Sequence, residues 1–193
     1  NETKCNSVSG FYGYIIENTK TGNLYCSIRG TDSLFGNPGA EDWGISTNGI
    51  AMKKFIEAYN FYIEETTPSG VTGYKIVMAN EKPETIDNCI IDNSNGNCFY
   101  LKSFIGTNND ISSSTQITMT GNSLGGHLAG LLSGLIGEKA IVFNAPGYST
   151  SVSKGFNLVE DGHLYTTNYS PYSAFNQLLK NIGQNSSVTH IYN

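Results

Sequence analysis

The chain has 193 residues, of which 38% are hydrophobic and 14% charged, and its formal net charge is −5. This length suits one globular domain with a core of ordinary size. The acidic balance and the absence of a run of lysine and arginine argue against a nucleic-acid partner, because phosphates are bound by clustered cations. The most apolar stretch, residues 124–136, is too short to span a bilayer.

The first predicted elements are strands at residues 11–17 and 24–29, where apolar and polar side chains alternate. Turn-forming residues 18–23 join them and predict an antiparallel hairpin. A Gly/Pro/Asp-rich loop follows from residue 30 to 48, and apolar residues at helical spacing then predict a helix at 49–66. The side of this helix that we expect to face solvent carries Lys53, Glu57, Asn60 and Glu64.

A strand at 74–78 precedes a polar stretch, residues 80–114, which we interpret as an insertion with an ordinary surface loop rather than a calcium loop. After a strand and helix around residue 123, we expect a strand at 139–144, a helix near 174–182 and a strand at 188–192. Strands that alternate with helices predict an α/β fold with a mostly parallel sheet and helices on both faces. Residues 1–193 form a single predicted domain without repeats.

Four cysteines, Cys5, Cys26, Cys89 and Cys98, show no C-x-x-C motif and no paired histidine spacing. We therefore expect no metal site and no cofactor. The simplest disulfides join Cys89 to Cys98 and Cys5 to Cys26, and four buried thiols are the alternative. Three Asn-x-Ser/Thr sequons also agree with secretion, which predicts an extracellular or periplasmic protein.

The most informative motif is Gly121-x-Ser123-x-Gly125, which follows the alternating residues Ile117 and Met119 and precedes a Leu/Ala/Gly-rich helix. A strand, a tight turn and a helix in this order are typical of a nucleophile elbow. The elbow holds its central residue in a strained conformation, so its neighbours must be small. Ser123 is therefore the candidate nucleophile, at a helix N-terminus that favours negative charge. A structural turn is the alternative.

A nucleophilic serine needs a histidine base, a carboxylate that orients the base, and N–H donors for the oxyanion. The residue after the nucleophile, Leu124, supplies the first donor by its backbone N–H. The second is expected where the predicted strand 24–29 ends in Gly30-Thr31, through an exposed backbone N–H or the threonine hydroxyl.

Three separated motifs together resemble the class-three lipases, especially bacterial members whose elbow reads G-[HN]-S-L-G-G-H-L. The motifs are Ile-Arg-Gly-Thr at 28–31 with a downstream Asp42-Trp43, Gly-Asn-Ser-Leu-Gly-Gly-His-Leu-Ala at 121–129, and Phe-Asn-Ala-Pro-Gly at 143–147. The resemblance covers roughly residues 11–65 and 115–193. It implies an α/β-hydrolase fold, hydrolysis of carboxylic esters or phospholipids, and a lid within residues 32–43. It also implies Ser123 as nucleophile, with Thr31 and Leu124 as the oxyanion hole.

The triad departs from this family pattern. In the family the aspartate comes just after a strand like residues 188–193, and the histidine comes later still. We therefore expect an incomplete domain whose aspartate and histidine lie beyond Asn193, in a further chain segment. Within the sequence the alternatives are Asp161, His163 and His190. His127 is carried by the family motif as a packing residue.

The expected function is therefore a secreted serine ester hydrolase of lipase or phospholipase A type, which forms an acyl-enzyme on Ser123. Its substrate would be a lipid or another acyl ester, with contact to a membrane surface as a further expectation. A small soluble esterase or acyltransferase would use the same triad. The alternative from another class is a catalytically inactive lipid- or partner-binding module that keeps a lipase fold.

Overall fold

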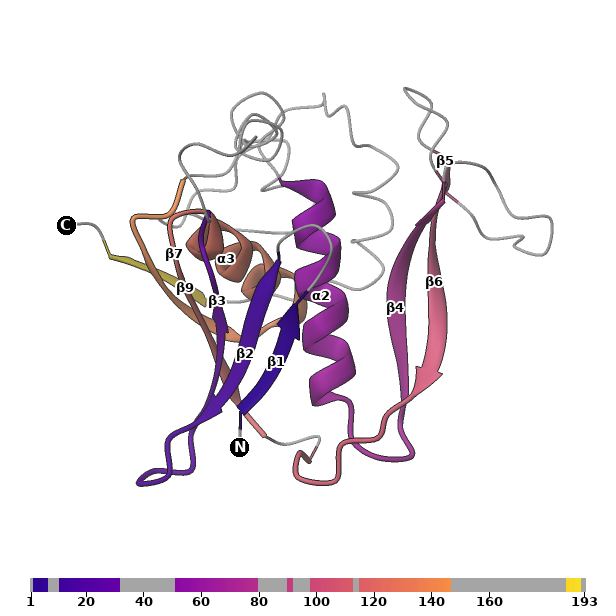
Figure 1. Cartoon of the computed structure of the whole chain (residues 1–193), viewed down its shortest axis with the longest axis horizontal. Coiled ribbons are helices and arrows are strands. Elements are labelled where there is room, and N and C mark those ends of the chain that lie inside the picture. Colours follow the sequence, from indigo (N-terminus) through magenta and orange to yellow (C-terminus); the bar gives the residue numbers. More distant parts are fainter. Residues whose placement is uncertain are drawn as a thin grey trace.

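The computed structural model of the chain describes residues 2–6, 11–31, 51–79, 90–91, 98–112, 115–146 and 187–191. Its described strands form one six-stranded sheet and one three-stranded sheet, and helix α2 (Met52–Thr66) lies between the two (Figure 1). The expected helix near 174–182, most of the loop 30–48 and Trp43 lie outside the described residues.

The six-stranded sheet is mixed, with three antiparallel strands followed by parallel ones. Its strands, in spatial order, are β1 (Glu2–Asn6), β2 (Tyr12–Glu17), β3 (Leu24–Ile28), β7 (Ile117–Asn122), β8 (Lys139–Phe143) and β9 (Ser187–Ile191). The predicted hairpin is confirmed as β2 and β3, with Ile15 opposite Cys26. Parallel pairing of β3, β7, β8 and β9 gives the chain its α/β character.

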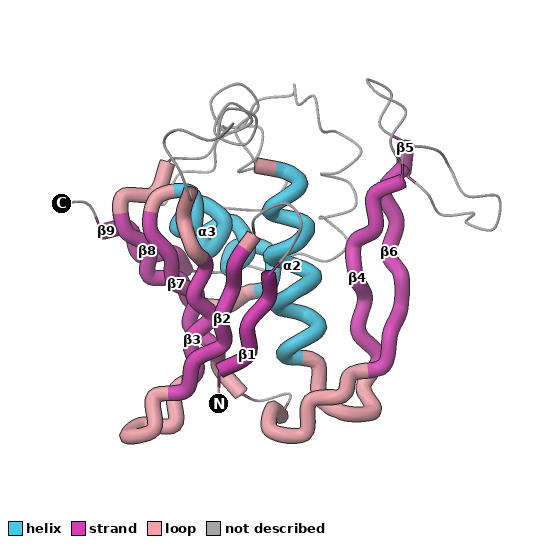
Figure 2. Tube along the Cα trace, viewed as in Figure 1, coloured by secondary structure: helices cyan, strands magenta, loops and turns pink. Residues whose placement is uncertain are grey.

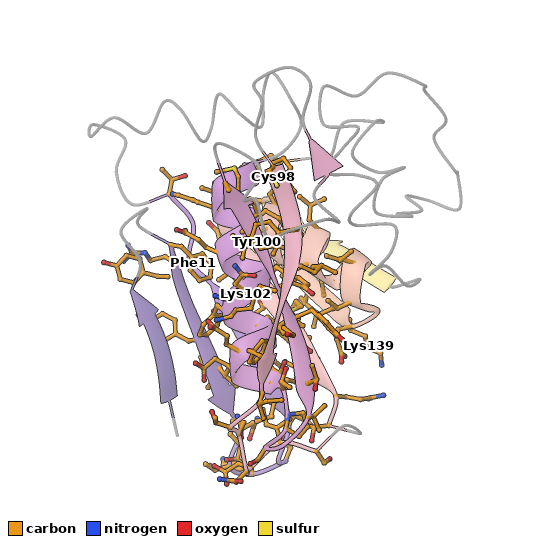
Figure 3. All side chains as sticks on the ribbon, turned by 90° about the vertical axis from the view of Figure 1, so that its right-hand side faces the viewer. Phe11, Cys98, Tyr100, Lys102 and Lys139 are labelled. Carbon is orange, nitrogen blue, oxygen red and sulfur yellow. The ribbon has the colours of Figure 1, made fainter. Side chains whose placement is uncertain are left out.

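The three-stranded sheet was not predicted. Strand β4 (Thr72–Ala79) pairs along its whole length with β6 (Cys98–Ile105), from Thr72 opposite Ile105 to Ala79 opposite Cys98, and β5 (Ile90–Ile91) pairs with β6. Residues 98–105 of the expected insertion 80–114 therefore form a strand that pairs with the whole of β4. Figure 3 shows β4 and β6 in front of α2, which packs on β4.

Helix α3 (Leu124–Ile136) follows β7 directly and packs on β3, β7 and β8, while α2 packs on α3, β2 and β4. Both described helices thus lie on the same face of the six-stranded sheet (Figure 2). The expectation of helices on both faces is not met by the described part of the chain. Gly137, whose φ of 80° is left-handed, ends α3. Neither described helix has the length and hydrophobicity that a membrane crossing requires.

Helix α2 is covered on two sides, which corrects the expectation that Asn60 faces solvent. Toward the six-stranded sheet, the ring of Phe61 lies 5.9 Å from that of Phe11. Toward the second sheet, the Asn60 side chain accepts a hydrogen bond from the N–H of Ile76 at 2.8 Å and donates one to its carbonyl oxygen at 2.9 Å. The side-chain amide therefore binds the backbone of β4 as a neighbouring strand would.

The expected disulfide between Cys5 and Cys26 is wrong. Cys5 lies opposite Gly13 on β1, whereas Cys26 lies on β3, so that β2 separates them. Two strand spacings amount to roughly 10 Å, too far for a disulfide. Cys26 is a fully buried free thiol, and burial raises its pKa to about 12. Cys89 lies outside the described residues, so its pairing with Cys98 stays a prediction.

Candidate active site

The backbone at Ser123 has the conformation expected of an elbow. Its φ is 53° and its ψ −127°, between the end of β7 at Asn122 and the start of α3 at Leu124. A residue with a side chain rarely adopts a positive φ, and such strain persists only where the surrounding structure imposes it. The Ser123 side chain is only half-buried, so the strained residue is partly exposed to solvent at the carboxyl end of β7.

Close backbone contacts explain the glycines of the motif. A Cβ atom on Gly121 would lie 2.4 Å from the carbonyl carbon and oxygen of Gly125. A Cβ atom on Gly125 would lie 2.2 Å from the carbonyl oxygen of Ile28, at the end of β3. Neither distance is compatible with a side chain, so only glycine lets the first turn of α3 pack on the ends of β3 and β7.

Three strand ends meet at the elbow. The N–H of Ser123 donates a hydrogen bond to the carbonyl oxygen of Phe143, the last residue of β8, at 2.9 Å. On the other side, a Cβ atom on Gly30 would lie 3.6 Å from Cβ of Ser123 and 2.7 Å from the Asn122 carbonyl oxygen. The carboxyl ends of parallel strands form the usual ligand-binding edge of an open α/β sheet.

A pocket of about 660 Å³ opens at this edge and is lined by residues 27–31, residues 120–123 and Phe143. The structure therefore brings two predicted site residues, Ser123 and Thr31, into one pocket. Leu124 is the first residue of α3, so its N–H has no acceptor within the helix. The strand ends and the helix start thus place the predicted donors beside the candidate nucleophile.

His127 packs as a neutral residue and does not line the pocket. It is fully buried in α3, and its Nδ1–H donates a hydrogen bond to the carbonyl oxygen of Pro146 at 3.3 Å. Burial lowers the pKa of His127 to about 4, although the bond to Pro146 opposes the shift. This placement agrees with a packing residue that holds the segment after β8 against α3.

The candidate triad partners are not brought to Ser123 by the described structure. Asp161 and His163 lie outside the described residues. His190 belongs to β9, in register with Val142 of β8, which is itself in register with Gly121. The backbone of His190 is therefore two strands away from β7, roughly 10 Å. It is level with Gly121, two residues before Ser123. All three remain predictions.

Three pocket residues were not singled out from the sequence: Ser27, Arg29 and Thr120. Among the described residues that line the pocket, Arg29 is the one with a charge, and it lies within the Ile-Arg-Gly-Thr motif. The sequence signal that could have indicated them is the alternation of side chains along β3, in which Cys26 and Ile28 are buried on the helix side. Ser27 and Arg29 then belong to the opposite face of the same strand.

Comparisons with protein-family models, with curated proteins and with solved structures found no significant match. Within the described part of the chain, no three acidic, histidine or cysteine side chains gather in a group that could hold a metal ion. The strained serine, its glycines and its pocket are therefore the features from which a function can be argued.

Proposed function

We propose that the chain is a serine ester hydrolase of lipase or phospholipase A type, with Ser123 as nucleophile. The observation that carries this proposal is the positive φ of Ser123 between a parallel strand and a helix, inside a pocket that also contains Thr31. The mixed, largely parallel sheet is compatible with an α/β-hydrolase fold. The lipid specificity rests on the three sequence motifs that resemble class-three lipases.

In the proposed reaction, Oγ of Ser123 attacks the ester carbonyl carbon while its proton passes to a base. The carbonyl oxygen becomes an oxyanion, which the Leu124 N–H and the Thr31 N–H or hydroxyl stabilise. Collapse of this intermediate expels the alcohol, which takes up the proton, and leaves an acyl group on Ser123. Water then attacks the acyl-enzyme, with the same base, and releases the acid.

The proposal also requires a base and a carboxylate that orients it, and the described structure places neither beside Ser123. Asp161, His163 and His190 are the candidates within the chain, and a further segment of chain is the other source. The three sequons and the predicted disulfide between Cys89 and Cys98 support a secreted protein, extracellular or periplasmic, with a substrate presented by a membrane surface.

An inactive lipid- or partner-binding module is the second candidate. The observation that favours it is the composition of the described part of the pocket lining, which includes no histidine, aspartate or glutamate. Such a module would keep the elbow as a packing feature and bind an acyl compound without cleaving it.

Hydrolysis of p-nitrophenyl butyrate tests the proposal. The enzyme should release p-nitrophenol, and Ser123→Ala should lower kcat/KM by about 10⁴-fold or more, as loss of a serine nucleophile does. Ser103→Ala, on the exposed face of β6, is the matched control and should leave the rate unchanged. No turnover by the folded wild-type chain or by a form extended past Asn193, together with equal binding of a short-chain lipid by wild type and Ser123→Ala, would establish the binding module instead.

A further inference from the structure

Helix α2 closes one edge of the second sheet. The Asn60 side chain binds both backbone polar groups of Ile76, and the hydroxyl of Tyr59 donates to the carbonyl oxygen of Tyr74 at 3.0 Å. These backbone groups therefore point toward α2 and away from β6. In an edge strand, every second residue directs its N–H and carbonyl oxygen away from the paired strand. The outer edge of β4 is thus already used within the chain.

The other edge of this sheet belongs to β6. Leu101 is in register with Ile76, so its N–H and carbonyl oxygen also point out of the pair, and Ser103 and Ile105 share this direction. Among the described strands, β5 pairs only with the first two residues of β6. Strand β6 is the outermost long strand in Figure 1, and both Ser103 and Ile105 are exposed on it, Ile105 to 59%. Residues 101–105 therefore present an edge that another strand can extend.

The side chains of β6 fit an antiparallel copy of the same strand. A twofold axis at Ser103 places this small residue opposite its own copy. Leu101 then lies opposite Ile105 of the second copy, so that two apolar side chains cover each other. On the other face of the sheet, Lys102 lies opposite Phe104 of the second copy.

Charge favours the same pairing. Phe104 lines a pocket of about 600 Å³, and Glu64, Glu65 and Asp110 are among the other lining residues. Burial and the neighbouring Glu64 carboxylate raise the pKa of Glu65, as expected where negative charges crowd together. Pairing about the twofold axis brings Lys102 of the second copy beside Phe104, and the flexible lysine stem can then reach these carboxylates. This attraction occurs twice, once at each acidic pocket.

We propose that the chain pairs with a second copy of itself through β6, so that the β4 and β6 strands of both copies form one continuous sheet. Backbone hydrogen bonds of Leu101, Ser103 and Ile105 join the two copies. The second sheet and the six-stranded sheet lie on opposite sides of α2 (Figure 1). The inference therefore does not depend on the proposed reaction of Ser123.

Sedimentation velocity at chain concentrations from about 5 to 500 µM measures the association, because a small interface is expected to be weak. The decisive variant is Ser103→Pro, which removes an N–H that points outward. Proline is tolerated at such a position of an edge strand, so the monomer should keep its fold, as checked by circular dichroism. Two matched controls are Ser103→Ala, which keeps the N–H, and Thr72→Pro, which places the same ring on the opposite edge of the pair.

The wild type should sediment as a monomer at the low end of this range and as a dimer at the high end. Ser103→Pro should raise the dissociation constant about 30-fold or more, because each copy loses a hydrogen bond. Both controls should associate like the wild type. Lys102→Glu should raise the constant about 10-fold or more, because it places a carboxylate beside the acidic pocket of the second copy.

Cysteine cross-linking locates the axis. In Ser103→Cys the two Cα atoms of the central pair would lie about 5.5 Å apart, which suits a disulfide. In a glutathione buffer this variant should form a covalent dimer, whereas Thr72→Cys should stay monomeric.

A wild type that stays monomeric at the highest concentration would overturn the proposal. In that case, binding of a peptide of alternating valine and glutamate that is lost in Ser103→Pro would assign the edge to another protein instead. A dimer that Ser103→Pro and Lys102→Glu leave intact would also overturn it, because the copies would then meet elsewhere. Oligomers larger than a dimer would contradict a closed twofold pairing. Should Ser103→Pro fail to fold, Lys102→Glu and Ser103→Cys decide the same question.

Discussion

The backbone N–H of Ser123 is hydrogen-bonded to the carbonyl oxygen of Phe143 at 2.9 Å. This bond joins the elbow to the end of β8 and engages the serine's own N–H. The next backbone donor for an oxyanion is the N–H of Leu124, which has no acceptor within the helix. His127 joins the same two segments through Pro146. The start of α3 and residues 143–146 therefore act as one support for the candidate nucleophile.

Gly125 should not tolerate a methyl group. In Gly125→Ala the new Cβ would lie 2.2 Å from the Ile28 carbonyl oxygen, so that α3 must move away from β3. We expect a loss of about 3 kcal/mol or more in the free energy of unfolding, measured in urea. Gly70→Ala is the control, because Gly70 has a φ of 80° but no atom within 4 Å of the new Cβ. It should cost only about 1–2 kcal/mol, and equal losses would contradict the close contact.

The backbone strain at Ser123 should be measurable as a difference in the free energy of unfolding between two variants. At a φ of 53° and a ψ of −127°, glycine has no steric penalty, whereas alanine keeps the full strain of the serine backbone. Ser123→Gly should therefore be more stable than Ser123→Ala by about 1 kcal/mol, after allowance for the greater flexibility of glycine in the unfolded chain. Urea unfolding of the two variants gives the difference. A more stable alanine variant would mean that the elbow is not strained.

Protonation of His127 should destabilise the fold in acid. Its pKa is about 4 when folded and 6.5 when exposed, so the unfolded chain binds more protons between these values. The stability that neutral His127 contributes is complete above pH 6.5 and is lost as the pH falls to about 4. A shift of this size corresponds to about 3 kcal/mol.

Urea unfolding at pH 7, 5 and 4 measures this loss. His127→Asn is the matched variant, because its amide can donate to the Pro146 carbonyl oxygen but does not titrate. It should be less stable than the wild type at pH 7 and lose less stability on acidification. The same pH dependence in both proteins would show that other groups are responsible.

Cys26 should react only after unfolding. Its thiol is fully buried with a pKa of about 12, and the thiolate is the reactive form. Iodoacetamide at pH 8 should therefore modify Cys26 in urea but not in the native protein, as read by peptide mass spectrometry. Modification of the native protein, or a peptide that links Cys5 to Cys26 before reduction, would contradict the structure.

Local patterns predicted much of the fold correctly. The alternation of β2 and β3, the turn between them and the helical spacing of α2 and α3 are short-range signals. The elbow could also be anticipated, because the glycines at 121 and 125 can be read beside Ser123. The close contact of Gly125 with Ile28, however, depends on two strands far apart in sequence.

The features that escaped prediction depend on such distant pairings. Strand β6 lies in a stretch that is polar overall, and it pairs with β4 although residues 80–97 separate the two strands in sequence. Asn60 is polar and occupies a helical position that the sequence predicts to face solvent, yet it binds the backbone of Ile76 because the second sheet covers it. Arg29 belongs to the pocket only because β3 lies beside β7.

A fluorophosphonate probe tests the central claim most directly. Such a probe reacts only with a serine that a base has activated, and peptide mapping locates the modified residue. The account predicts that the chain, or a form extended by its natural C-terminal segment, is labelled at Ser123 and not in Ser123→Ala. A folded wild-type protein that stays unlabelled in both forms, or label on another serine, would contradict a nucleophilic Ser123.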